Sequence, residues 1–267
     1  MYNNGKWENP KVVMYCQIGG AIDMAEFSIN SAIENAGLPV EDFDLVFICW
    51  KTPPKTYEWL KKNNYKYVDM KYDEGRGFLW NLYKGWNLGY KIGLEHADFI
   101  CPIATDHAFY TNWLKNLLKH GKENRIVNCK LIEPGTISTL HTYINLGLTV
   151  EQEFQQEKFD QFCGFLMEGK EDKLVIEDID GLYHQNRGIG GTYGHRLDAM
   201  PFLVHRSVWN KFGPMNQGLN IYGTTGDTDF FDRCRMGGVE IAKSLDAISY
   251  HCGGAETKRN QAQGIYT

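Results

Sequence analysis

Three places in the sequence carry side chains that could do chemistry. Asp106 follows the apolar run 99–103, and His251 follows the apolar run 247–250 directly. The third place is Gly226-Asp227-Thr228-Asp229, where carboxylates open an expected helix. A carboxylate just past a central strand lies where open α/β sheets bind ligands, and its oxygen atoms suit a divalent cation. Asp106 is equally compatible with capping the next helix, and His251 with a purely structural role.

The elements that must position these residues alternate between strands and helices. Apolar runs predict strands in the first half at 11–16, 44–49, 67–70 and 99–103. Helical spacing of apolar residues predicts helices at 22–36, 56–62, 79–94 and 113–118. Such alternation favours a mixed, mostly parallel sheet with helices on both faces. The loops after the parallel strands then gather at one edge of the sheet.

The second half of the chain is less regular. We expect strands at 126–132, 200–205, 239–242 and 247–250, and helices over 150–170, around 208–212 and over 229–236. The glycine-rich stretch 183–199 predicts a long binding loop. We expect a single domain over 1–267, made of two halves at 1–125 and 126–254, with a polar tail at 255–267.

Composition excludes several classes of protein. The 267 residues are 43% hydrophobic and carry a net charge of −5, which gives no strong nucleic-acid signal. No apolar run approaches the ~18 residues that a membrane span needs, and the first residues contain no apolar segment typical of a signal peptide. The seven cysteines form no CxxC pair, and several fall in strand-like runs. We therefore expect buried thiols and a cytoplasmic location.

The order of these motifs resembles glycosyltransferase family 2, whose members have the GT-A fold. Asn87-Leu88-Gly89 matches an Asn-x-Gly pattern of that family, and Ala104-Thr105-Asp106 occupies the place of its Asp-x-Asp motif. The run 201–206 is similar to a strand of the family that ends in an arginine, here Arg206, and 212–216 is similar to the turn that follows it. Gly226-Asp227-Thr228-Asp229 stands at the Glu-Asp-x-Asp position, with Arg233 after it. His251 matches a histidine after the last strand that is often a metal ligand.

The resemblance implies an inverting transfer of a sugar from a nucleotide-diphosphate sugar to an acceptor hydroxyl. It makes 1–125 the nucleotide-sugar-binding half and 126–254 the acceptor and catalytic half. It implies Mn²⁺ or Mg²⁺ on the diphosphate, with Asp106 and His251 as the protein's ligands. Asp227 is the implied general base, and Asp229 is the second candidate. The residues expected at the donor are Gln17, Ile18, Trp50, Arg76, Asn87, Thr105 and Asp106. The acceptor stays open among a glycan, a lipid carrier, a protein and a modified nucleobase.

Three departures from the family keep alternatives open. Ala104 replaces the first Asp of Asp-x-Asp, Gly226 replaces the Glu, and the base-reading Asp is missing around Trp50. A non-catalytic nucleotide- or sugar-binding module of the same fold is therefore one alternative. A sugar nucleotidyltransferase is another, although Gln17-Ile18-Gly19-Gly20 lacks the basic residue it would want.

Other histidines and glycines give weaker signals. A zinc site from His184, His195 and His205 is disfavoured, because their spacing fits no standard pattern. The glycine run 188–191 follows no clear strand and opens no clear helix, so it is no dinucleotide or phosphate-loop fingerprint.

Overall fold

A computed structural model describes residues 10–19, 22–133, 142–144, 146, 153–169, 173–177, 200–218 and 226–252. The expected binding loop at 183–199 and the polar tail at 255–267 lie outside these residues. The described strands form one sheet, in the order β3-β2-β1-β4-β9-β6-β10-β5, with β7 beside β6 and β8 beside β10. This single sheet contains strands from both halves of the chain.

The first half of the sheet is parallel, as the strand-helix alternation predicts. It consists of β1 (Val12–Ile18), β2 (Phe43–Cys49), β3 (Lys66–Asp69) and β4 (Phe99–Ile103). Every residue of β2 is buried, which explains why its sequence is almost continuously apolar. In the register, Cys16 of β1 lies beside Ile103 of β4, so the loops after these two strands leave the same edge.

The second half of the sheet is mixed. The antiparallel strand β9 (Phe202–His205) joins β4 to β6 (Arg125–Glu133), and β6 pairs in parallel with β10 (Glu240–His251). Three short strands complete it: β5 (His107–Phe109) and β8 (Leu174–Ile176), both antiparallel to β10, and β7 (Thr142–Tyr143), parallel to β6.

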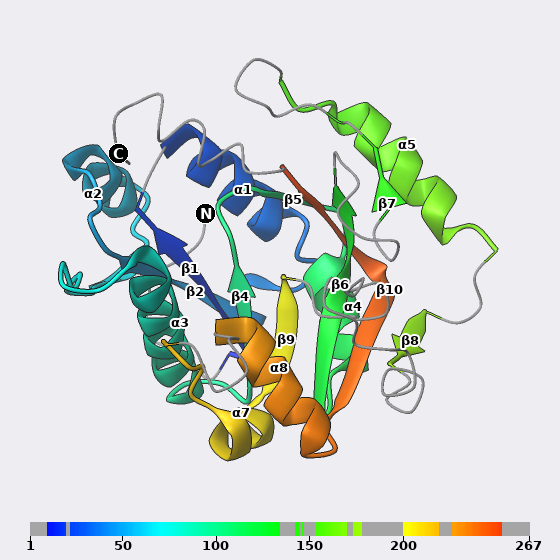
Figure 1. Ribbon diagram of the computed structural model, residues 1–267. Helices are drawn as coiled ribbons and strands as arrows, with labels where there is room; N and C mark the ends of the chain where they lie inside the picture. Colours follow the sequence, from blue (N-terminus) through cyan, green and yellow to red (C-terminus); the bar gives the residue numbers. More distant parts are fainter. Residues whose placement is uncertain are drawn as a thin grey trace.

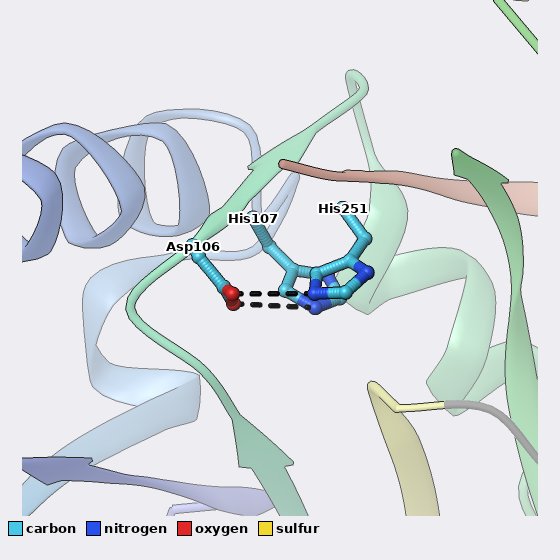
Figure 2. Close-up of side chains that lie close together, drawn as sticks. All are labelled: Asp106, His107 and His251. Atoms are coloured by element: carbon cyan, nitrogen blue, oxygen red, sulfur yellow. Dashed lines mark hydrogen bonds and ion pairs between the residues drawn. The ribbon is translucent and has the colours of Figure 1, made fainter. Parts of the chain in front are cut away.

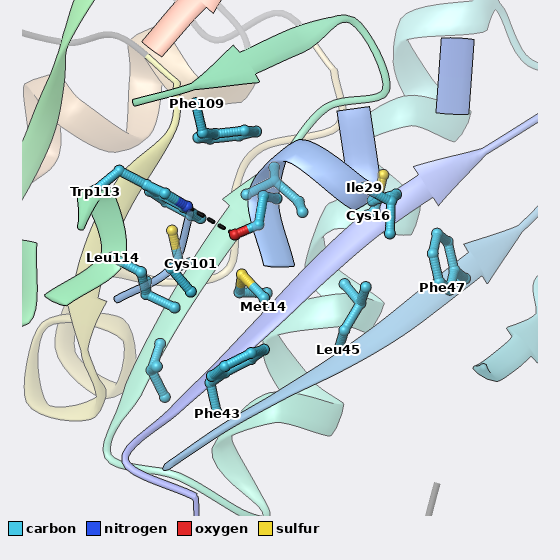
Figure 3. Close-up of a cluster of buried hydrophobic side chains, with 14 of the residues drawn as sticks. Met14, Cys16, Ile29, Phe43, Leu45, Phe47, Cys101, Phe109, Trp113 and Leu114 are labelled. Atoms are coloured by element: carbon cyan, nitrogen blue, oxygen red, sulfur yellow. Dashed lines mark hydrogen bonds between the residues drawn. The ribbon is translucent and has the colours of Figure 1, made fainter. Parts of the chain in front are cut away.

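Helices cover both faces of this sheet (Figure 1). One face packs α1 (Ile22–Glu34), α2 (Pro54–Lys62) and α4 (Trp113–His120), whose side chains share a core with alternate residues of β1, β2 and β4. Figure 3 shows part of that core, including Met14, Phe47 and Trp113. The other face packs α3 (Phe78–Leu94), α7 (Arg206–Phe212) and α8 (Gly226–Met236). A smaller cluster joins α5 (Gln156–Met167) to β10, and a 3₁₀ turn at Val40–Asp42 precedes β2.

The last strand corrects one prediction. The sequence indicates two short strands at 239–242 and 247–250, whereas β10 is one continuous strand. The polar run between them stays within the strand because its side chains are buried and hydrogen-bonded. Ser244 donates to Asp246 at 2.5 Å, and Asn116 of α4 donates to the Asp246 carbonyl at 2.6 Å. The pairing of β10 with β6 shifts register between Lys243 and Ile248, where this network lies.

The described cysteines are buried and unbridged, as expected for a small apolar side chain. All seven are free. Among the described residues, no helix combines the length and the apolar character that crossing a bilayer requires.

Candidate metal and base site

Asp106 and His251, 145 positions apart, meet at one edge of the sheet. Asp106 ends the short turn after β4, and His251 is the last residue of β10. Strand β5, which begins directly after Asp106, pairs with β10 so that His107 lies opposite His251. Asp106 Oδ2 is 3.2 Å from His251 Nε2, and the Cys252 backbone N–H donates to the Asp106 carbonyl at 2.8 Å. Strand pairing therefore brings the two predicted ligands together.

His107 is a third member of this cluster, and sequence reasoning missed it. Its Nε2 lies 3.8 Å from Asp106 Oδ1, and its ring is 5.0 Å from that of His251. One ligand atom from each of the three residues falls within 4.8 Å of the others, and the side chains converge in Figure 2. Adjacent residues of a strand point to opposite faces. Asp106 and His107 can converge because Asp106 belongs to the turn before β5.

The three potential ligands, Asp106, His107 and His251, suit a transition metal. One carboxylate and two imidazoles fit Mn²⁺ better than the all-oxygen shell that Mg²⁺ prefers. Burial alone would raise the pKa of Asp106, but the hydrogen bond from His251 and the charges of His107 and His251 outweigh it. The pKa of Asp106 is consequently lowered, which favours the ionised carboxylate. A cation bound here would need both imidazoles in their neutral form, so its binding would release protons.

The turn that carries Asp106 is fixed by α1. The buried Ser28 hydroxyl donates to the Ala104 carbonyl at 2.9 Å and lies 3.2 Å from the His107 backbone N–H, which donates to it. The alternative that Asp106 caps the following helix is wrong, because β5 intervenes and the residue before α4 is Asn112.

Asp227 is held by a different part of the molecule. It lies in the first turn of α8, where its Oδ1 accepts hydrogen bonds from the Tyr83 hydroxyl at 3.0 Å and the Thr228 backbone N–H at 2.8 Å. Asp229, the second candidate base, is 6% exposed and forms an ion pair with Arg233 at 2.9 Å. That pairing within α8 explains Asp229 as a structural residue.

The residues expected in the donor loops near β1 are mostly engaged in packing. Gln17 donates to the Leu82 carbonyl of α3 at 2.8 Å and accepts from the Trp50 indole N–H at 2.8 Å. Trp50 is 5% exposed and stacks on Tyr72, which leaves little ring surface for a nucleobase. The Ile18 side chain is buried in the core. The roles predicted for these residues at a donor stay predictions.

Three further predicted donor residues differ in exposure. Asn87 is structural, because its amide donates to the Met215 carbonyl at 2.9 Å and accepts from the Met215 N–H at 2.8 Å. Arg76 is exposed and its guanidinium lies 4.6 Å from the Trp80 ring, where it can reach an anion in solvent. Thr105 is 2% exposed and precedes the cluster. The donor contacts predicted for Arg76, Asn87 and Thr105 stay predictions.

One of the three histidines considered for zinc has a structural explanation. His205 precedes α7, and its Nδ1 accepts a hydrogen bond from the Ser207 backbone N–H at 3.2 Å. It therefore caps that helix. His184 and His195 lie outside the described residues.

The strand order, the helices on both faces and the cluster beyond β4 define a class of fold. The protein has the α/β fold of a GT-A glycosyltransferase, with a mixed sheet, as the sequence predicts. A crystal structure of GalNAc-T7 with UDP, GalNAc and Mn²⁺ is similar over 92% of this chain, with a TM-score of 0.55 and 12% sequence identity.

The likeness to GalNAc-T7 concerns the fold. The matched region is 44% of that protein, so the present chain spans less than half its length. No protein-family model matches the sequence, and no curated protein matches it. The resemblance to glycosyltransferase family 2 in particular remains a prediction.

Proposed function

We propose that this chain is a metal-dependent glycosyltransferase that moves a sugar from a nucleotide-diphosphate sugar to an acceptor hydroxyl with inversion. The observation that carries the proposal is the cluster of Asp106, His107 and His251 at the edge of the sheet beyond β4. Ligands bind beyond the carboxyl ends of strands in open α/β sheets. The similar fold of GalNAc-T7, solved with UDP and Mn²⁺, supports the assignment.

Each residue of the site has a distinct role in this proposal. Asp106, His107 and His251 would hold Mn²⁺, or more weakly Mg²⁺, and the bound ion would neutralise the negative charge on the departing diphosphate. Asp227 accepts the proton of the acceptor hydroxyl as that oxygen bonds to the anomeric carbon. The bond to the diphosphate oxygen breaks on the opposite face, so the anomeric configuration inverts. Arg76 can add a charge-assisted contact to the diphosphate.

The partners are defined by class only. The donor is a nucleotide-diphosphate sugar, and uridine donors are the first to test because GalNAc-T7 was solved with UDP. The acceptor is a glycan, a lipid carrier, a protein or a modified nucleobase. We also propose a cytoplasmic location, which the seven free thiols support because a reducing compartment keeps them unpaired.

The decisive experiment measures Mn²⁺ binding by calorimetry with and without UDP, followed by donor hydrolysis and transfer assays. We expect UDP to tighten Mn²⁺ binding in the wild type and Asp106→Asn to abolish that effect. Asp246→Asn is the matched control, because Asp246 also lies 3.2 Å from a histidine, His120, away from this cluster. Equal Mn²⁺ binding by the wild type and Asp106→Asn would refute the metal site.

A non-catalytic binding module is the second candidate. Ala104 and Gly226 stand where the family has acidic residues, and this loss of carboxylates favours it. Mn²⁺-enhanced UDP binding without hydrolysis or transfer, whatever acceptor is offered, would identify a module. Where transfer does occur, the anomeric configuration of the product, read by NMR, tests inversion.

A further inference from the structure

We propose that Tyr83 positions the carboxylate of Asp227, the proposed general base. Position 226 is a glycine because a side chain there would occupy the space of the Tyr83 ring and keep its hydroxyl from reaching Asp227. This inference rests on the proposed function, because it concerns how Asp227 is held for proton transfer. Tyr83 lies on α3 and Asp227 on α8, 144 positions later, and the tyrosine hydroxyl donates to Asp227 Oδ1 at 3.0 Å. The Thr228 N–H donates to the same oxygen at 2.8 Å, which fixes the plane of the carboxylate.

The glycine before the base is required by the tyrosine ring. A Cβ added to Gly226 would lie 1.7 Å from Tyr83 Cζ and about as close to the neighbouring ring carbons. Gly226 also has a φ of +60°, a conformation that side-chain-bearing residues rarely adopt. Gly226, which replaces the Glu expected from the resemblance, is thus explained: the ring of Tyr83 occupies the space into which a side chain at 226 would grow.

Tyr83 cannot easily swing away from this position. Its ring is 7% exposed and contacts Trp86 edge-on at 6.0 Å between centroids. Helix α3 is itself anchored on both sides, by Gln17 at the Leu82 carbonyl and by the two hydrogen bonds between Asn87 and Met215. The hydroxyl is therefore presented to Asp227 by a rigid element, as a positioning role requires.

The hydroxyl is also held in its donor form. Burial raises the pKa of Tyr83 well above its usual value, and the charge of Asp227 and the hydrogen bond to it raise it further. Among the described residues, Tyr90 of α3 also interacts electrostatically with this carboxylate, and the Asp229–Arg233 ion pair lies on the same helix as Asp227. Tyr90 is buried with its pKa raised, and Asp229 forms an ion pair with Arg233, whereas the Tyr83 hydroxyl donates directly to Asp227.

The test is Tyr83→Phe, which keeps the ring and removes the hydroxyl. We expect kcat to fall about tenfold while the donor KM changes by less than about twofold, because orientation of the base is lost but donor binding is not. In a plot of kcat against pH, the acidic pKa should rise by about half to one pH unit, because a carboxylate that loses a hydrogen-bond donor binds protons more readily. Thermal unfolding confirms that the variant is folded.

The matched control is Tyr57→Phe. Tyr57 of α2 also donates its hydroxyl to an aspartate, Asp69 of β3, at a place unconnected with the candidate base. The Tyr57→Phe variant should leave kcat and the acidic pKa of the kcat profile unchanged. If Tyr83→Phe behaves like Tyr57→Phe, or lowers kcat without moving this acidic pKa, Tyr83 is only a packing residue and the inference is overturned.

A second pair of variants tests the steric claim without an assay of activity. Gly226→Ala should lower Tm in the wild type and lower it less in a Tyr83→Ala background, because the ring that the new Cβ meets is gone. Equal losses of Tm in the two backgrounds would show that backbone strain alone demands glycine, which overturns the coupling.

Failure of the proposed function would be distinguishable from failure of this inference. If the wild type neither hydrolyses donors nor transfers sugars, the carboxyl carbon of Asp227 can still be titrated by NMR, with Asp227→Asn giving the assignment. A midpoint that rises in Tyr83→Phe and stays unchanged in Tyr57→Phe supports the pairing. An unchanged midpoint in both rejects it.

Discussion

The two carboxylates of the proposed site, Asp106 and Asp227, are positioned by different means. Asp106 is placed mainly by the backbone around it. The pairing of β5 with β10 sets His107 opposite His251, and hydrogen bonds from the Cys252 N–H and with the Ser28 hydroxyl hold the turn. Asp227 is placed by side chains, since the Tyr83 hydroxyl reaches it from another helix. Strand pairing fixes a set of ligands around a point, whereas a hydroxyl fixes the orientation of one group. The former suits a cation and the latter suits proton transfer.

The largest expected effect comes from removing the base itself. Asp227→Asn keeps the shape and the hydrogen bond from Thr228 but cannot accept a proton, so transfer should fall by about 10³-fold. Mn²⁺ and UDP binding should stay near wild type, since the cation is held elsewhere. Rates come from initial-velocity assays with a saturating donor.

Asp232→Asn on the same helix is the control for that substitution. Its carboxylate lies 3.4 Å from Arg235, and its loss should cost little activity. A decrease of less than about tenfold in Asp227→Asn would assign the proton transfer to another residue, because a general base contributes more than that.

The next largest effect concerns the attachment of α8, the helix that carries the base. Arg235 forms two hydrogen bonds to Glu177 at 2.6 and 3.0 Å, and both side chains are buried. Glu177→Ala leaves the guanidinium buried without that partner, so the free energy of unfolding should fall by about 3 kcal/mol. Urea denaturation measures it.

A double substitution separates the ion pair from simple packing. The double variant Glu177→Leu/Arg235→Met removes both charges of this pair, so it should regain most of the stability that Glu177→Ala loses. If Glu177→Ala costs less than about 1 kcal/mol, the ion pair is not what holds α8 to the rest of the protein.

Smaller effects are expected from the two histidines of the metal cluster taken singly. His251→Ala and His107→Ala should each weaken Mn²⁺ binding by at least about 10 to 100-fold, because each removes a ligand and the loss of an outer-shell partner alone costs that much. His120→Ala, at the other Asp–His pair, should leave Mn²⁺ binding unchanged. Calorimetric titration with Mn²⁺ and then Mg²⁺ tests both.

If His107→Ala binds Mn²⁺ as tightly as the wild type and His251→Ala binds it more weakly, then the ligands are only the two residues expected from the sequence, Asp106 and His251. Mg²⁺ bound as tightly as Mn²⁺ would argue against any imidazole ligand, because Mg²⁺ prefers oxygen.

Much of the fold is predictable because its signals are local. The parallel strands β1, β2 and β4 are buried on both faces and read as apolar runs, and α3 and α4 show helical spacing of apolar residues. β10 is split in the prediction because Lys243, Ser244 and Asp246 interrupt its apolar pattern. Asp246 is held there by Asn116 and His120 of α4, which are distant in sequence.

The site was predictable only where one residue carries the signal alone. Asp106 follows β4 and His251 ends β10, and the sequence places both residues beside apolar runs. Tyr83 reads as one more member of the apolar stripe of α3, since its partner is 144 positions away. His107 reads as the start of a loop until β5 pairs with β10. Gly226 reads as a missing carboxylate, although its φ and the ring of Tyr83 account for it.

The smallest expected effect tests whether the far end of β10 matters to the cluster. Glu240, at the start of the strand, is partly exposed and pairs with Arg125 and with Lys122, 3.4 Å away. Burial raises the pKa of Glu240, but the hydrogen bonds and charges of Arg125 and Lys122 outweigh it and lower the pKa overall. A lowered folded-state pKa stabilises the protein above the ordinary Glu pKa, and this stability is lost as the pH falls through the folded-state value.

Glu240→Gln should therefore be slightly less stable than wild type at pH 7, and the difference should shrink as the pH drops below about 4.3. Urea midpoints at several pH values measure this, with Glu58→Gln on the exposed side of α2 as the control. Mn²⁺ affinity should not change, because the pairing of β5 with β10 at the opposite end holds His251. A loss of Mn²⁺ affinity in Glu240→Gln would mean that the whole of β10, and not its local pairing, positions the metal ligands.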